Sequence, residues 1–137
     1  MGDRCYLSIT IRKQDEEKFT EVLKKHGEVQ DSGDDLFDEV ADEDQTIRYT
    51  MFEANYGLTD EREQWAKEMT FYGDHGAGGG YGPILFVAYN GELIEVDSDW
   101  SGNPMVPVNP ETGQPSAGVL AHVQRYLAAV KAINAQE

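Results

Sequence analysis

The chain has 137 residues, of which 26 are acidic and 11 basic, and its formal net charge at pH 7 is −15. This charge argues against direct binding to nucleic acid or to anionic membranes, because like charges repel, and it favours basic proteins as partners. The length and the hydrophobic fraction of 39% indicate a single domain, residues 1–137, with a core of its own.

Residues 4–12 alternate between apolar and polar side chains, which predicts a strand with one buried face. Apolar residues then recur at helical spacing as far as Gly27, a common helix stop. Asp15 is placed to cap this helix, and Glu16 and Glu17 suit the positive end of its dipole. A strand followed by a helix is therefore predicted at the start of the domain.

An acidic segment, residues 28–44, follows this helix and contains nine carboxylates and no Lys or Arg. Such dense like charge does not pack into an apolar core, so the segment must be solvated or meet a basic surface. Leu36, Phe37 and Val40 lie within it, and they predict a short strand over residues 36–40. These apolar side chains would hold the carboxylates against the sheet.

The next predicted element is a strand over residues 45–55, which are rich in β-branched and aromatic side chains. Thr59 or Asp60 is then placed to cap a short helix over residues 60–69. A loop is predicted over residues 73–82, because six of these ten residues are glycine.

Two apolar runs, residues 84–89 and 92–97, flank the pair Asn90-Gly91, which favours the type I′ turn of a β-hairpin. A loop with four prolines covers residues 98–115, and a terminal helix begins near Ser116. The buried stripe of this helix is predicted to consist of Val119, Leu120, Val123, Leu127, Val130 and Ile133.

This order of elements predicts an α+β domain with an antiparallel or mixed sheet of about five strands and with helices packed mainly on one face. The chain has too few crossover helices for a doubly wound parallel sheet. Its first half resembles a split β-α-β, ferredoxin-like arrangement.

The glycine loop contains two adjacent titratable residues, Asp74 and His75. Glycines allow close backbone approach to an anion, but phosphate-binding glycine loops follow a strand and open a helix. The predicted loop instead follows a helix and opens a strand. We therefore favour a structural or partner-contacting loop with Tyr72 and Tyr81 as interface anchors, and a small enzyme that uses Asp74 and His75 is the alternative.

A second acidic cluster lies on and after the predicted hairpin. Residues 97–102 match the first half of a calcium-binding loop, but Val108 occupies the position where a bidentate Glu is needed. On one strand Glu95, Asp97 and Asp99 would share a face. That face is either a solvated sheet surface or a second acidic contact surface beside the acidic segment.

Catalytic and metal-binding motifs are absent from the sequence. His26, His75 and His122 are far apart, and no serine lies in a G-x-S-x-G motif. We therefore expect no catalytic residues, no cofactor and no metal.

Cys5 is the only cysteine, so the chain can form no internal disulfide. The N-terminus has no apolar signal core, and no stretch approaches the roughly 20 apolar residues that span a bilayer. These observations predict a cytoplasmic protein.

Three segments, MGDRCYLSITIRKQDEEKF, FEANYG and YGDHGAGGGYGP with the following FVAYNGELIEV, resemble small uncharacterised acidic proteins of bacteriophages and other bacterial mobile elements. The likeness covers about half of the chain. In its character, a compact acidic chain with one cysteine, the protein is also similar to anti-CRISPR and anti-restriction inhibitors, some of which mimic DNA. This resemblance implies a location in the bacterial host cytoplasm and transfers no functional residue.

We therefore expect a binding protein, not an enzyme, that inhibits a basic nucleic-acid-handling bacterial protein of a defence system. An immunity protein that neutralises a cationic nuclease toxin has the same charge logic and stays as an alternative. The oligomeric state is left open. The residues predicted to contact the partner are Asp31, Asp34, Asp35, Asp38, Glu39, Asp42, Glu43, Asp44, Glu95, Asp97, Asp99, Tyr72 and Tyr81.

Overall fold

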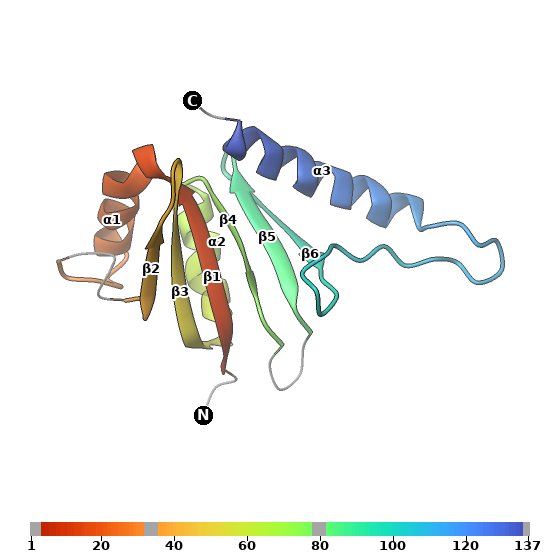
Figure 1. The fold of residues 1–137 in the computed structure, drawn as a ribbon, viewed down its shortest axis with the longest axis horizontal. Coiled ribbons are helices and arrows are strands. Elements are labelled where there is room, and N and C mark those ends of the chain that lie inside the picture. Colours follow the sequence, from red (N-terminus) through yellow and green to blue (C-terminus); the bar gives the residue numbers. More distant parts are fainter. Residues whose placement is uncertain (1–3, 32–35, 78–81, 136–137) are drawn as a thin grey trace.

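A computed structural model describes residues 4–31, 36–77 and 82–135 (Figure 1). Its strands and helices, in chain order, are β1 (Arg4–Arg12), α1 (Glu16–Lys25), β2 (Glu39–Asp42), β3 (Thr46–Asn55), α2 (Thr59–Ala66), β4 (Phe71–His75), β5 (Ile84–Tyr89), β6 (Glu92–Asp97) and α3 (Ala117–Asn134). Two short 3-10 turns, η1 (Lys13–Asp15) and η3 (Tyr56–Leu58), precede α1 and α2.

The strands form one six-stranded sheet in the order β2-β3-β1-β4-β5-β6, and every neighbouring pair is antiparallel. The predicted α+β class is therefore confirmed. Because β3 lies between β1 and β2, the unit β1-α1-β2 is a split β-α-β motif, and β3-α2-β4 is a second one around β1. The first four strands thus have the ferredoxin-like arrangement, and the β5-β6 hairpin extends their sheet.

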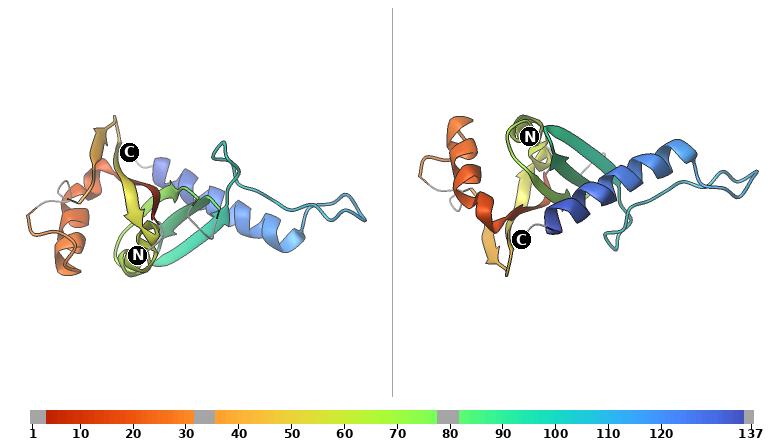
Figure 2. Two further views of the ribbon diagram at one scale, coloured as in Figure 1. Left: turned by 90° about the horizontal axis from the view of Figure 1, so that it is seen from below. Right: turned by 90° about the horizontal axis from the view of Figure 1, so that it is seen from above.

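The sheet carries a hydrophobic core on each face. Successive strand residues point to opposite faces, and in β5 Phe86 and Ala88 pack with α1 and α2 whereas Leu85 and Val87 pack with α3. Helices α1 and α2 therefore share one face, as predicted, and α3 covers β5 and β6 on the other (Figures 1 and 2).

Local signals in the sequence account for several element boundaries. Gly27 has φ +84°, and the N–H groups of Gly27 and Glu28 return to the carbonyls of Lys24 and Leu23 to close α1. Asp15 precedes α1, but its carboxylate accepts a hydrogen bond from Arg12 Nε at 2.6 Å instead of capping the helix. Asn90 and Gly91 both have positive φ, as a type I′ turn requires.

Four predicted boundaries and contacts differ from the structure. The strand expected over residues 36–40 begins at Glu39, because Leu36 and Phe37 turn into the core before β2 starts. Helix α2 begins at Thr59 and ends at Ala66, and Leu58 occupies its N-cap position. The predicted stripe of α3 is wrong at Val119 and Leu127, which are 36% and 49% exposed, because α3 contacts the sheet through the residues Val123, Tyr126, Ala129 and Ile133.

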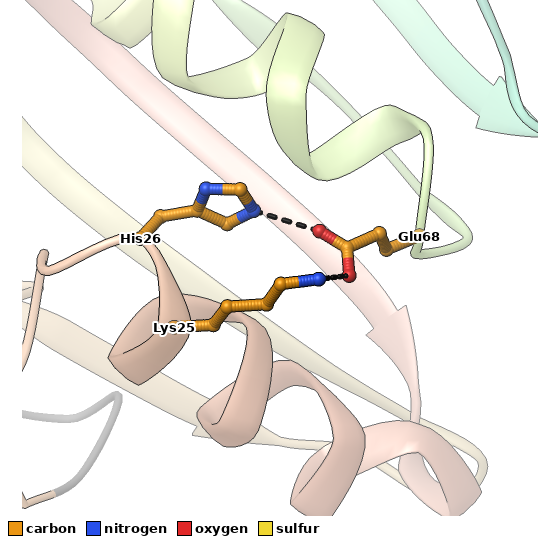
Figure 3. A network of polar contacts seen from close by, with 3 residues as sticks. All are labelled: Lys25, His26 and Glu68. Atoms are coloured by element: carbon orange, nitrogen blue, oxygen red, sulfur yellow. Dashed lines mark hydrogen bonds and ion pairs between the residues drawn. The ribbon is translucent and has the colours of Figure 1, made fainter.

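A polar network joins the end of α1 to the chain after α2 (Figure 3). One carboxylate oxygen of Glu68 contacts Lys25 Nζ at 2.5 Å, and the other lies 2.8 Å from His26 Nε2. The hydrogen bonds from Lys25 and His26 lower the pKa of Glu68. The network therefore stabilises the packing of α1 against α2 while the carboxylate is ionised.

The variant Glu68→Gln is expected to unfold at a lower temperature than the wild type at neutral pH. Folding lowers the pKa of Glu68, so its ionised carboxylate stabilises the folded protein at pH values above the pKa that Glu68 has in the unfolded chain. This stabilisation is lost as the pH falls through the lowered pKa of Glu68 in the folded protein. Thermal melts of both proteins across that range should therefore converge at acidic pH. An equal difference at every pH would contradict an electrostatic role.

Candidate functional site

Residues 38–42 of the acidic segment are held at the outer edge of the sheet. Strand β2 pairs with β3 from Glu39 opposite Thr50 to Asp42 opposite Ile47. The carboxylate of Asp38 accepts a hydrogen bond from the backbone N–H of Phe52 at 2.8 Å. Upstream of β2, Phe37 is buried and Leu36 packs against the core. The carboxylates next to these anchors therefore have defined positions.

Six of the predicted contact residues are exposed, and we refer to them together as the acidic edge: Asp31, Asp38, Glu39, Asp42, Glu43 and Asp44. Asp42 forms an exposed ion pair with Lys13 at 2.7 Å, and Glu43 lies 3.8 Å from Arg48. The other members form no ion pair with any residue that the structure describes. Asp34, Asp35 and Tyr81 lie outside the described residues.

The second acidic cluster lies at the opposite edge of the sheet. Glu95 and Asp97 are on β6, opposite Phe86 and Ile84 of β5, and they lie on one face of the sheet, the face on which α1 and α2 pack. Because β2 and β6 are the two edge strands, these residues do not extend the acidic edge. The second acidic surface, which was predicted to lie beside the acidic segment, is therefore separated from it by the width of the sheet.

Asp99 does not lie on β6 and organises a turn. Its carboxylate accepts hydrogen bonds from the backbone N–H groups of Ser101 and Asn103, both at 2.9 Å. These bonds lower its pKa, that from Asn103 most strongly. In the ranges 4–31, 36–77 and 82–135, no group of three or more His, Cys, Asp or Glu side chains could hold a metal ion.

The predicted glycine loop is partly a strand, because β4 includes Gly73, Asp74 and His75. Gly73 is required where β4 packs against β1, since a Cβ there would lie 1.9 Å from the carbonyl oxygen of Ser8. Tyr72 is half-buried in the same strand and donates a hydrogen bond to Asn134 of α3 at 3.2 Å. Its hydroxyl therefore contacts the chain's own helix.

Asp74 and His75 lie on opposite faces of the sheet, as neighbouring strand residues must. Asp74 is opposite Leu85 on the α3 face, and His75 is opposite Ile84 on the other. Burial raises the pKa of Asp74 and lowers that of His75. The two side chains cannot act as a catalytic pair, so this enzyme hypothesis loses its geometric basis.

A cavity of about 680 Å³, here called the α2 cavity, opens between η3, α2 and β4–β6. It is lined by Asn55, Tyr56, Thr59, Asp60, Glu61, His75, Ile84 and Glu95. Tyr56, Gly57 and Leu58 of η3 all have left-handed backbones, with φ of +54°, +62° and +54°. Two of these residues are not glycine, so this wall of the cavity stores backbone strain.

A buried guanidinium lies next to the α2 cavity. Arg62 is fully buried, 4.2 Å from the ring centroid of Phe86 and 3.6 Å from a carboxylate oxygen of Glu95. His75 is also buried, and its Nδ1 is hydrogen-bonded to the carbonyl of Gly76 at 2.9 Å. The carboxylates around a neutral imidazole give this cavity a wall of hydrogen-bond acceptors.

The stability of the protein is expected to fall as the pH is lowered through about 6.5, the ordinary pKa of histidine. Burial lowers the pKa of folded His75, and the charge of Arg62 lowers it further. As the pH falls, the unfolded chain therefore binds this proton at a higher pH than the folded protein does. Neutral His75 contributes fully to the free energy of unfolding above about pH 6.5, and this contribution is lost as the pH falls below that value. Urea titrations of wild type and His75→Gln should show a shallower pH dependence in the variant; identical slopes would contradict this.

Sequence reasoning did not identify the α2 cavity. Its walls come from η3, α2, β4, β5 and β6, which only the fold brings together. One signal was present, because Arg62 lies three and four residues before Trp65 and Ala66 and so belongs to the buried side of α2.

Comparison of the chain with protein family models, with curated proteins and with solved structures finds no match. None of the helices described here is both long and apolar enough to cross a membrane.

Proposed function

We propose that this chain is a binding protein that inhibits a basic, nucleic-acid-handling protein of a bacterial defence system. The acidic edge would occupy the Lys and Arg side chains that otherwise contact phosphates. The bacterial setting and the host cytoplasm as the location follow from the resemblance to phage proteins.

One observation carries this proposal: Glu39 and Asp42 of the acidic edge are exposed and lie on the paired strand β2, and Asp38 and Glu43 flank that strand. A surface whose charges have defined positions loses less conformational entropy on binding than a flexible acidic tail. The net charge of −15 adds long-range attraction to any basic partner and accelerates its association.

The proposal is tested by capture from a bacterial lysate on the immobilised chain, followed by competition with duplex DNA. A genuine target should be retained at about 0.1 M salt and released at about 1 M, because the Debye length falls from about 10 Å to about 3 Å. After purification, the target should be displaced from the chain by DNA, and the chain should block its DNA binding. Retention that is insensitive to salt, or a captured protein that DNA does not displace, would overturn the proposal.

A further inference from the structure

The segment between β6 and α3 begins with a tight turn, residues 97–105, which we call the Trp100 turn. The backbone N–H of Met105 bonds to the carbonyl of Asp97 at 2.9 Å, and that of Asp99 bonds to Asn103 at 2.9 Å. Gly102 has φ +83° and closes the turn onto the Asp99 carbonyl at 3.2 Å. With the bonds to the Asp99 carboxylate, these contacts define the backbone on both sides of Trp100.

Trp100 is 84% exposed, whereas Trp65, the other tryptophan of the chain, is fully buried. An indole presented to water on an ordered turn is unusual, because its large apolar area is usually buried in a core or an interface. Met105 and Val108 are also about half exposed, at 49% and 57%. The segment that carries them extends away from the sheet (Figures 1 and 2). Among these side chains only tryptophan is of a type enriched as an anchor of protein interfaces.

The charges around this turn indicate the chemistry of its partner. On β6 Glu92 is paired with Arg125 and Glu95 with Arg62, whereas Asp97 forms no ion pair with any residue that the structure describes. Asp97 is exposed at the base of the turn. A second copy of the chain, with its own charge of −15, would be repelled from this surface. A cation is attracted both by a carboxylate and by the face of an indole.

We propose that the Trp100 turn binds an arginine side chain of a basic protein partner, with the guanidinium over the indole of Trp100 and paired with the carboxylate of Asp97. This inference rests on the proposed function, to which it adds a second contact surface at the opposite edge of the sheet from the acidic edge. Because the turn is ordered by its own hydrogen bonds, its backbone loses little conformational entropy on binding.

Fluorescence titration with nona-arginine and nona-lysine peptides tests the inference. Binding of nona-arginine should change the emission of Trp100, and Trp65 should not respond because it is buried. The variant Trp100→Ala should weaken nona-arginine binding by roughly three- to fivefold, the value of an exposed cation–π contact. Val108→Ala, which removes a neighbouring exposed apolar side chain, is the matched control and should bind like the wild type.

The same titration on a variant with a neutralised acidic edge separates the two proposals. If that variant loses affinity and Trp100→Ala does not, the inference fails and the proposed function survives. If Trp100→Ala loses affinity and the edge variant does not, the Trp100 turn is supported and the acidic edge is not the contact surface. Absence of binding by both peptides would overturn the inference.

Discussion

Replacing Asp31, Glu39, Glu43 and Asp44 by their amides is expected to slow association with the captured basic partner by about tenfold at low salt. These carboxylates are exposed members of the acidic edge, so under the proposed function they face the basic surface of the partner. The variant leaves Asp38 in place because its hydrogen bond to Phe52 helps to hold β2. Stopped-flow mixing over a range of salt concentrations measures the effect.

A matched control removes the same number of charges elsewhere, at the exposed residues Glu53, Asp60, Glu63 and Glu111. It has the same net charge as the edge variant, so general attraction is lowered equally in both. The control should associate faster than the edge variant and with a steeper dependence on salt. Equal rates for the two would show that net charge, and not the acidic edge, attracts the partner.

The variant Gly73→Ala is expected to destabilise the fold by about 3 kcal/mol or more, at the upper end of overpacking effects. A Cβ at residue 73 would lie 1.9 Å from the carbonyl oxygen of Ser8, and it would be 3.1 Å from the Cα of Ile9. Both atoms belong to the backbone of β1, so no side-chain rotation can relieve the clash. Strand β4 would have to move away from the centre of the sheet.

Urea unfolding measures this effect, and Gly82→Ala is the control. A Cβ at residue 82 would meet no atom within 4 Å, and the φ of this glycine is not in the left-handed region. Its substitution should change the free energy of unfolding by less than about 0.5 kcal/mol. A stable Gly73→Ala variant would mean that β1 and β4 are not in close contact at this position.

The sequence predicted those elements whose side chains have a clear period. Alternation predicted β1, helical spacing predicted α1, and Asn90-Gly91 predicted the β5-β6 hairpin. Strand β4 was not predicted because Gly73 has no side chain to continue the alternation of apolar and polar residues. This position requires glycine because the backbone of Ser8 in β1 leaves no room for a Cβ atom. Local composition cannot express such a contact.

The candidate surfaces depend on tertiary structure in the same way. The chain order suggested that Glu95 and Asp97 lie beside the acidic segment, but the sheet places β6 and β2 at opposite edges. Exposure of Trp100 follows from the turn that Asp99 builds around it. Side-chain type therefore indicated acidic and aromatic contacts, and only the strand order determined which of them can act together.

The central position of β1 has a consequence for synthesis of the chain. This strand precedes both of its neighbours in the sequence, and its second neighbour, β4, ends only at His75. Until then β1, which carries the apolar residues Leu7, Ile9 and Ile11, has at least one unpaired edge. Nascent chains would therefore be most prone to aggregate before β4 emerges from the ribosome, and ribosome-bound chains that end before and after β4 should differ in their resistance to protease.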